Sequence, residues 1–326
     1  MTAIHNEHPF GWKPLPHPVF RDDVLREQIH TEGYATIPFL DDSQLNEIQQ
    51  IYSRFHKLSD ARGGMFYGVY SADLDYRRQT DLAIRQVLLT SFPSWFREFE
   101  NPVNFFVSKL PGPASEFDIH QDMTSMDEFR YSPLSLWIPL QDTRKENGTI
   151  CIVPRTHWLF SPYRGISWPF PFASFKPIIR KYLQPLQFSA GEALVFDPRI
   201  LHSSLPNISS QPRVAVVSGI FPEGFEFINC FREPGTGNVT ELYRQEKDWV
   251  LTYPNFLKNC HSRPVTGEVI GNAKFEFPEM NAEKFISFCK KNSIAENPNV
   301  NNFMQENCNM IGEPVMQEDE TVVSGS

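Results

Sequence analysis

The division of the apolar residues into short runs, separated by turn-forming residues, limits the fold of this chain more than any other feature. The 326 residues include 28 phenylalanines, 27 prolines and 17 glycines. The runs that we interpret as strands lie at residues 33–39, 101–110, 134–140, 149–153, 187–196 and 214–220. Runs this short, bounded by glycine and proline, favour the strands of antiparallel sheets over a helical bundle. The sequence therefore predicts a mainly β protein with flanking helices.

Helical segments are expected at two places. The residues Asp41-Asp42-Ser43 offer helix caps ahead of apolar residues at helical spacing, which predicts a helix over about 43–57. A second helix is expected over residues 281–291, within a part of the chain that otherwise has mixed character.

Two of the connections between strands carry their own signals. Asn147-Gly148 stands between the runs 134–140 and 149–153, which predicts that these two runs form a hairpin. Residues 160–185 are irregular and rich in proline and aromatic residues, so they cannot hold a regular central strand. They are expected to form either a loop over a pocket or a crossover packed against the sheet.

The length of the chain permits one large domain, or one domain with an appendage. We expect residues 1–225 to form the core with an N-terminal helical entry, and residues 226–311 to form an extension packed on it. Residues 312–326 are acidic and end in serine and glycine, so they are expected to be disordered. Three roles of the extension stay open, namely covering the pocket, forming a homodimer contact, or recognising a larger substrate.

The charge and the cysteine content exclude several kinds of partner and site. The formal net charge is −9, and no long cluster of lysine and arginine occurs, which argues against binding to nucleic acid or to an anionic membrane. The first ten residues have no apolar core of signal-peptide length, and no stretch approaches the roughly 20 apolar residues of a membrane span. The five cysteines are an odd number and include no C-x-x-C pair, which argues against a disulfide framework and against a zinc ribbon. The sequence predicts a cytoplasmic protein.

A His-x-Asp pair at His120 and Asp122 is a candidate for binding a metal. On a strand, residues two apart share a face, so both side chains could take adjacent positions on one ion. The pair alone has little specificity, because 9 histidines and 15 aspartates in 326 residues give about 0.4 such matches by chance. Other parts of the chain must support the assignment.

A longer pattern follows the fifth apolar run. It consists, in order, of Gly191-Glu192, a buried run, His202, Ser204, Asn207 and Arg213. Arg213 comes eleven residues after His202. This order resembles the phytanoyl-CoA dioxygenase-like family of iron and 2-oxoglutarate oxygenases, which has a distal histidine followed by a serine, an asparagine and an arginine at this offset.

The resemblance extends toward the N-terminus. Residues 136–142, 146–149 and 153–157 look like the central block of the family, and residues 33–40 look like its usual entry. Coverage is roughly residues 30–222, and several ordered motifs at the right mutual spacing make the match specific. One departure is Arg155, because the family often has Pro-Gly-Ser-His where this chain has Pro154-Arg155-Thr156-His157. Arg155 is expected either to disturb the local turn or to reach toward the pocket.

The resemblance implies a double-stranded β-helix core, also called a jelly roll or cupin-like fold. It implies Fe(II) held by His120, Asp122 and His202 as the catalytic set, with 2-oxoglutarate as co-substrate and O2 as oxidant. Two nitrogens and one carboxylate on one face of an octahedron leave three positions open for these molecules. His157 is expected to pack or to hydrogen-bond, and not to bind the metal.

The resemblance also implies which residues bind the co-substrate. Arg213 is expected to pair with the distal carboxylate of 2-oxoglutarate, because a guanidinium fork binds a carboxylate through two parallel hydrogen bonds. Ser204 is expected to add a hydroxyl donor to the same carboxylate. Trp137 is expected to line the pocket or to belong to the core, and Asn104 is expected to hydrogen-bond the co-substrate.

The activity that follows is the hydroxylation, or a related oxidation, of a small organic substrate in secondary metabolism, with release of succinate and CO2 and with ascorbate as reductant. Asp122 favours oxidation over halogenation, because related iron halogenases replace this carboxylate with a small residue. An acyl-CoA would need a basic entrance, which the net charge of −9 does not favour. Two alternatives stay open, a cupin-like metalloenzyme that does not use 2-oxoglutarate and a non-catalytic binding protein.

Overall fold

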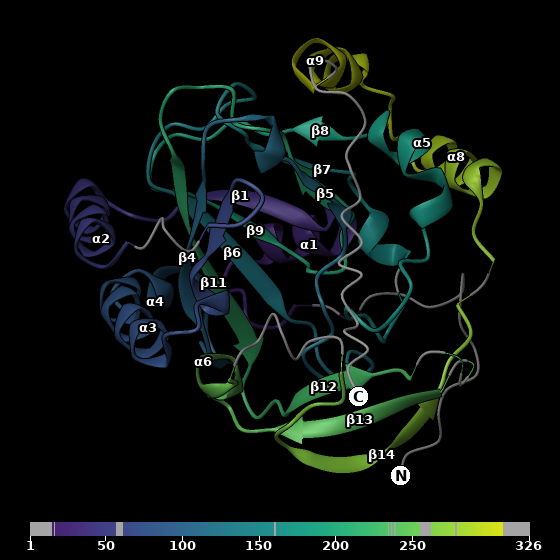
Figure 1. Ribbon diagram of the computed structural model, residues 1–326, viewed down its shortest axis with the longest axis horizontal. Helices are drawn as coiled ribbons and strands as arrows, with labels where there is room; N and C mark the ends of the chain where they lie inside the picture. Colours follow the sequence, from purple (N-terminus) through teal and green to yellow (C-terminus); the bar gives the residue numbers. More distant parts are fainter. Residues whose placement is uncertain are drawn as a thin grey trace, which may run out of the picture.

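Two antiparallel sheets form the centre of the molecule (Figure 1). The computed structural model describes residues 15, 17–56, 61–159, 161–233, 235, 237, 239–254, 262–277 and 279–308. The larger sheet has the order β1 (Tyr34–Pro38), β9 (Glu192–Phe196), β6 (Leu134–Pro139), β11 (Arg213–Pro222), β4 (Asn104–Lys109) and β2 (Met65–Tyr67), with β3 (Phe99–Glu100) paired to β11. The smaller sheet has the order β5 (Phe117–His120), β10 (His202–Ser204), β7 (Ile150–Ile152) and β8 (Gln184–Pro185).

The chain passes from one sheet to the other at almost every connection between β4 and β11. β4, β6, β9 and β11 belong to the larger sheet, while β5, β7, β8 and β10 belong to the smaller one. This alternation winds the chain around a common interior, which is the arrangement of a jelly roll. The mainly β, jelly-roll fold expected from the sequence is confirmed.

The hairpin predicted between residues 134–140 and 149–153 is wrong. Both runs are strands, but β6 pairs with β9 and β11, whereas β7 pairs with β10 and β8 in the other sheet. Asn147-Gly148 does form a tight turn, in which Gly148 has a φ of 81° and the Asn147 side chain accepts a hydrogen bond from the Arg144 N–H. The turn lies within a connection between the two sheets.

The alternation of side chains along the strands divides the core into layers. On β6, Leu136 and Ile138 pack outward against helices, whereas Trp137 packs into the space between the sheets. On β7, Ile150 and Ile152 point into that same space, and Cys151 packs outward. Because both faces of these strands are covered, most of their side chains are apolar.

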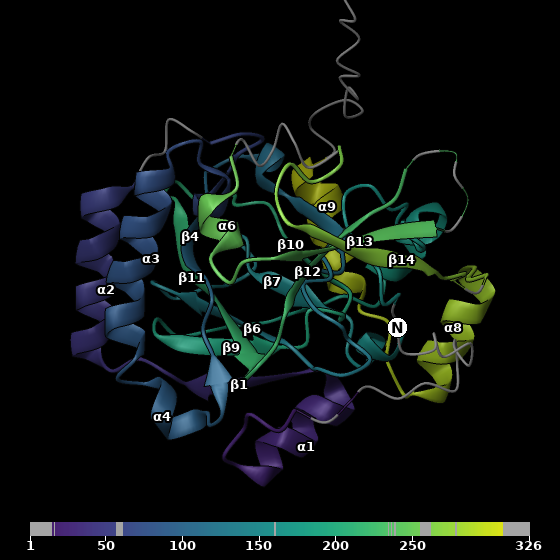
Figure 2. The same ribbon diagram turned by 90° about the horizontal axis from the view of Figure 1, so that it is seen from below.

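Helices cover the outer faces of both sheets (Figure 2). The first four are α1 (Asp23–Glu32), α2 (Asp42–Phe55), α3 (Leu74–Leu88) and α4 (Phe92–Trp95), and the later ones are α5 (Lys176–Arg180), α6 (Trp249–Thr252), α8 (Ala282–Lys291) and α9 (Pro298–Cys308). Single turns occur at η2 (Gly68–Tyr70), η3 (Pro113–Ser115), η4 (Thr156–Trp158) and η5 (Ala173–Phe175). Apolar residues of α2 and α3 pack on the larger sheet, and those of α8 and α9 pack on the smaller one.

Local capping explains where the predicted helices begin. Asp41 accepts a hydrogen bond from the Gln44 N–H, and the Gln44 side chain accepts one from the Asp41 N–H, which is a capping box. The helix predicted over about 43–57 is thereby confirmed as α2. The helix predicted over 281–291 is confirmed as α8, which is capped by Asn281.

Beyond β11 the chain forms a third sheet of β12 (Phe227–Phe231), β13 (Val239–Gln245) and β14 (Glu268–Lys274), and then α8 and α9. The division of the chain near residue 225 stays a prediction, and residues 312–326 lie outside the described residues. In the described part of the chain, Cys151, Cys230 and Cys289 are free, and no helix is long and apolar enough to cross a membrane.

Candidate metal centre and adjoining cavity

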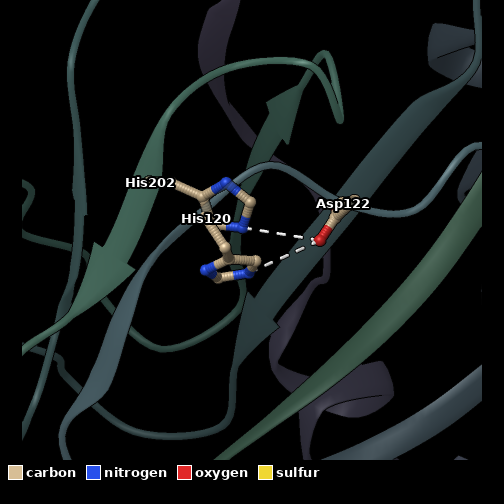
Figure 3. Close-up of side chains that lie close together, drawn as sticks. All are labelled: His120, Asp122 and His202. Carbon is tan, nitrogen blue, oxygen red and sulfur yellow. Dashed lines mark ion pairs between the residues drawn. The ribbon is translucent and has the colours of Figure 1, made fainter. Parts of the chain in front are cut away.

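Three potential metal ligands, His120, Asp122 and His202, converge at one end of the smaller sheet (Figure 3). β10 pairs antiparallel with β5, and the register places His202 directly opposite His120. One oxygen of Asp122 lies 3.6 Å from the Nε2 atom of each histidine. The ligand atoms of all three residues lie within 4.8 Å of one another.

Hydrogen bonds fix both imidazole rings with Nε2 directed at the centre of this cluster. The Nδ1 atom of His120 lies 2.8 Å from the main-chain oxygen of Asp118, and the Nδ1 atom of His202 lies 2.9 Å from that of Ile200. A carbonyl oxygen can only accept a hydrogen bond, so Nδ1 carries the proton in each ring. In the neutral form of each ring, Nε2 is then the atom that carries the lone pair a metal requires.

The charges of the cluster also suit a cation. Burial, together with the nearby His120, lowers the pKa of His202 to about 4, so this ring is neutral at neutral pH. Burial acts to raise the pKa of the Asp122 carboxyl, but His202 and His120 hold it below its ordinary value. The cluster thus offers two imidazole nitrogens and one carboxylate, a donor set that fits Fe(II) with open coordination positions.

The main chain of Asp122 is held from two sides. Its N–H donates to the Pro198 oxygen at 2.8 Å, and its oxygen accepts a hydrogen bond from Nε of Arg164 at 2.7 Å. Arg164 in turn forms a buried, bidentate ion pair with Glu128. The sequence analysis missed Arg164, because nothing in its local sequence links it to Asp122, which lies 42 positions away.

The cluster opens into a cavity of about 770 Å³ between the two sheets and the segments that cover their open end. Ser204 on β10, Trp137 on β6 and Arg213 on β11 line this cavity together with the three potential ligands. The structure thus brings together six of the seven residues that the resemblance singled out. Tyr67 on β2 also lines the cavity, and sequence reasoning missed it because β2 is a short edge strand far from the motifs.

Arg213 is the main fixed positive charge deep in the cavity. It is 2% exposed, and its guanidinium carbon lies 4.9 Å from the centre of the Trp137 ring. One nitrogen donates to the Gly148 oxygen at 2.9 Å, but Nε and Nη1 are buried and have no hydrogen-bond partner. Buried donors without partners are costly. Arg213 therefore keeps two buried donors available on the cavity side.

Asn104, which was expected from the sequence to hydrogen-bond the co-substrate, does not line this cavity. Its side-chain amide donates to Asp81 and Asn101, and its oxygen accepts a hydrogen bond from the Ser218 hydroxyl at 2.7 Å. Asn104 is completely buried and does not line the cavity. Its amide instead joins β4 to α3 and β11.

His157 and Arg155 lie outside the cluster as well. His157 is buried, and its Nε2 donates to the His30 oxygen at 3.0 Å, as a structural role requires. Arg155 adopts a left-handed conformation with a φ of 67° and pairs with Glu32 through Nε and Nη2. It also donates to the Asn292 oxygen. Arg155 therefore preserves the turn and does not reach the pocket.

The first half of the irregular segment, residues 161–171, lies over the cavity. Tyr163, Arg164, Trp168 and Phe170 are among its residues that line the cavity. Phe172, Phe175 and Ile179 instead pack with Cys151 on the outer face of the smaller sheet. Both arrangements left open for this segment are therefore found, a loop over a pocket in its first half and a crossover packed against the sheet in its second.

A family model described as Phytanoyl-CoA dioxygenase (PhyH) matches residues 29–215, more than half of the chain. Among curated proteins, "Phytanoyl-CoA dioxygenase domain-containing protein 1" of Danio rerio is 28% identical over 131 residues, which cover 36% of this chain and 44% of that protein. "Phytanoyl-CoA dioxygenase 1" of Oryza sativa subsp. japonica is 27% identical over 121 residues, which cover 35% of this chain and 41% of that protein. The chain thus spans less than half of the length of these curated relatives.

Similar solved structures include the epimerase SnoN in complex with Fe3+, alpha ketoglutarate and nogalamycin RO, with 19% identity and a TM-score of 0.46 over 66% of this chain and 91% of that chain. Another is HygX from Streptomyces hygroscopicus with nickel, 2-oxoglutarate and hygromycin B bound, with 13% identity and a TM-score of 0.45 over 62% of this chain and 87% of that chain.

Proposed function

Since the chain belongs to the phytanoyl-CoA dioxygenase (PhyH) family, we propose that it is an Fe(II)- and 2-oxoglutarate-dependent dioxygenase that hydroxylates, or otherwise oxidises, a small organic molecule. Membership of the family confirms the recognition made from the sequence, and with it iron and 2-oxoglutarate as the class of cofactor. Release of succinate and CO2, and a place in secondary metabolism, are parts of the proposal.

One observation carries the proposal. The cluster of His120, Asp122 and His202 and the unpartnered guanidinium of Arg213 line the same cavity. A metal that kept open positions would bind one end of a dicarboxylate, and Arg213 would bind the other end. A metalloenzyme without 2-oxoglutarate would need a different anion to engage these two donors.

Iron, when bound, supplies the redox chemistry that activates O2 and oxidises the substrate. His120, Asp122 and His202 would hold it, since their donor set and their fixed rings fit Fe(II). The residues of the chain position the reactants and keep the site dry. Ser204 would donate its hydroxyl to the carboxylate beside Arg213, and Trp137 would form the wall against which the guanidinium stacks.

The proposal predicts how iron and 2-oxoglutarate bind. In the absence of O2, the purified chain is expected to bind one equivalent of Fe(II), and 2-oxoglutarate is then expected to produce a visible charge-transfer band. His202→Ala removes one of three ligands and should lower the affinity for Fe(II) by at least about 100-fold, as judged from typical contributions of metal ligands and their partners.

The matched control is His56→Ala, because His56 is an exposed histidine at the end of α2, remote from the cluster. It should leave both titrations unchanged. A His202→Ala chain that still bound Fe(II) as tightly as the wild type would contradict the ligand assignment. A metal-loaded chain that did not bind 2-oxoglutarate would instead support a cupin-like metalloenzyme or a binding protein.

A further inference from the structure

The outer part of the cavity is built by segments that do not belong to the jelly roll. Tyr163, Trp168 and Phe170 come from the segment over the cavity. Phe277, Glu279 and Met280 come from the link between β14 and α8, within the C-terminal part of the chain. Residues 277–280 lie outside the stretch matched by the family model, so the family does not account for this wall.

Aromatic contacts join the two segments into one wall. The Phe277 ring packs edge-on against Phe172 with 5.5 Å between centroids, and Phe275 packs on Tyr163 at 6.1 Å. Met280 is 8% exposed and belongs to the apolar cluster that also contains Phe172. The C-terminal part is therefore fixed against the cavity by packed side chains, and its residues contact whatever fills the outer part.

The charges around the cavity do not favour an anionic substrate. Among the described lining residues, the cations beyond Arg213 already have acidic partners. Arg164 is paired with the buried Glu128, and Nζ of Lys176 lies 2.5 Å from a carboxylate oxygen of Asp118. Glu279, which is exposed, adds a negative charge to the outer wall. A phosphate or sulfate in the outer part would lose water without gaining a free cation in return.

The apolar character of the wall completes the inference. On the proposed function, Arg213 is engaged by 2-oxoglutarate at the inner end, which leaves the aromatic outer part to the substrate. We propose that the substrate is a largely apolar molecule that carries no anionic group such as coenzyme A, phosphate or sulfate, and that the wall formed by Phe277, Glu279 and Met280 selects it. A cavity of about 770 Å³ lies within the range of about 300–1,000 Å³ that suits drug-sized molecules.

The test compares matched pairs of molecules that share a skeleton and differ by one anionic group. Suitable pairs are testosterone and its sulfate, farnesol and its phosphate, and 1-naphthol and its phosphate. Palmitoyl-CoA serves as a further anionic ligand. Binding to the full chain loaded with Fe(II) and 2-oxoglutarate is measured by anaerobic equilibrium dialysis. The neutral member of each pair that binds is expected to bind at least about tenfold more tightly, because no free cation meets the anion.

Two substitutions place this selectivity in the wall. Glu279→Lys should strengthen the binding of the anionic members by about tenfold and leave the neutral members unchanged. Its control, Glu47→Lys, makes the same charge change at an exposed position on α2. Phe277→Ala should weaken the binding of the neutral members, whereas Phe288→Ala, in a residue packed on the same cluster but absent from the cavity lining, should not.

Uptake of 2-oxoglutarate by the chain separates a failure of this proposal from a failure of the proposed function. If anionic members bind as tightly as neutral ones, or if no pair binds to a chain that has taken up 2-oxoglutarate, the inference is overturned while the oxygenase assignment stands. Equal effects of Glu279→Lys and Glu47→Lys would likewise overturn it. Failure to take up 2-oxoglutarate would overturn the proposed function itself, and with it this inference.

Discussion

At the scale of single residues, Arg213 has the least ordinary environment. A buried arginine normally pairs with an acid, because an unpaired buried charge is costly. Arg213 instead stacks on Trp137, donates once to the Gly148 oxygen, and keeps two donors without partners. Burial lowers its pKa to about 10, which still leaves it charged at neutral pH. On the proposed function, the carboxylate of 2-oxoglutarate would offset the cost of this arrangement.

Replacement of this arginine tests its role in binding 2-oxoglutarate. Arg213→Met removes the charge but keeps an apolar side chain for the Trp137 face, so the chain should still fold. The dissociation constant for 2-oxoglutarate on the iron-loaded chain should rise by roughly 100-fold, since charge-assisted hydrogen bonds contribute about 1.5–3 kcal/mol each. Calorimetric titration in the absence of O2 measures this.

The control is the same change at Arg244 on β13. The ion pairs of Arg244 with Glu226 and Glu268 lie on the surface. Arg244→Met should leave the affinity for 2-oxoglutarate as it was. An Arg213→Met chain with wild-type affinity would show that Arg213 does not bind the co-substrate.

Sequence reasoning reached the residues of the site unequally, for a physical reason. His120 and Asp122 were identifiable only because the pattern around His202 supported them, and strand register then determined their meeting. The direction of the Asn104 amide on β4 could not be predicted, because it depends on a hydrogen bond to Asp81, which lies on α3. A motif identifies the residue, whereas hydrogen bonds from distant elements decide where its side chain is used.

At the scale of elements, the turn before η4 shows how a departure from a family pattern is accommodated. Arg155 stands where the family often has glycine, and it keeps the left-handed conformation that glycine would adopt freely. Its pairing with Glu32 ties this turn to the end of α1. The backbone strain at Arg155 is thus offset by a contact that glycine could not make.

Two substitutions separate the backbone effect from the contact. Arg155→Ala and Arg155→Gly both lose the pairing with Glu32, but only glycine relieves the left-handed conformation. The glycine variant should therefore be the more stable by about 1 kcal/mol in urea unfolding. At the exposed Lys181, whose φ is −66°, the order should be reversed, with alanine the more stable. If the alanine variant at 155 matched the glycine variant, the strain would be absent.

The misassigned hairpin shows where element-level prediction fails. Two apolar runs with an Asn-Gly turn between them satisfy the local signal for a hairpin. Pairing is decided instead by the strands that flank each run in space, and β6 and β7 find those partners in different sheets. Most strand positions were predictable because short apolar runs mark them, but their assignment to sheets depends on contacts between residues far apart in sequence.

At the scale of the whole molecule, the proposed oxidation and the proposed choice of substrate depend on different parts of the chain. The jelly roll brings the potential metal ligands and Arg213 to one cavity, and it lies largely within the stretch that matches the family. Tyr163, Trp168 and Phe170, together with Phe277, Glu279 and Met280 from the C-terminal part, form the outer wall. The role of the C-terminal part, which sequence reasoning left open, could not be predicted because its contribution consists of side-chain contacts with the cavity.

The most direct test of the central claim measures succinate formed from 2-oxoglutarate when the iron-loaded chain is exposed to O2 with ascorbate present. The wild-type chain is expected to release succinate and CO2 in equal amounts, with a faster rate when a neutral apolar substrate is added. His202→Ala and Arg213→Met should each lower the rate by at least about 100-fold, which corresponds to about 2.7 kcal/mol. The central claim would be contradicted if the wild-type chain released no succinate under these conditions. It would also be contradicted if neither substitution changed the rate of succinate release.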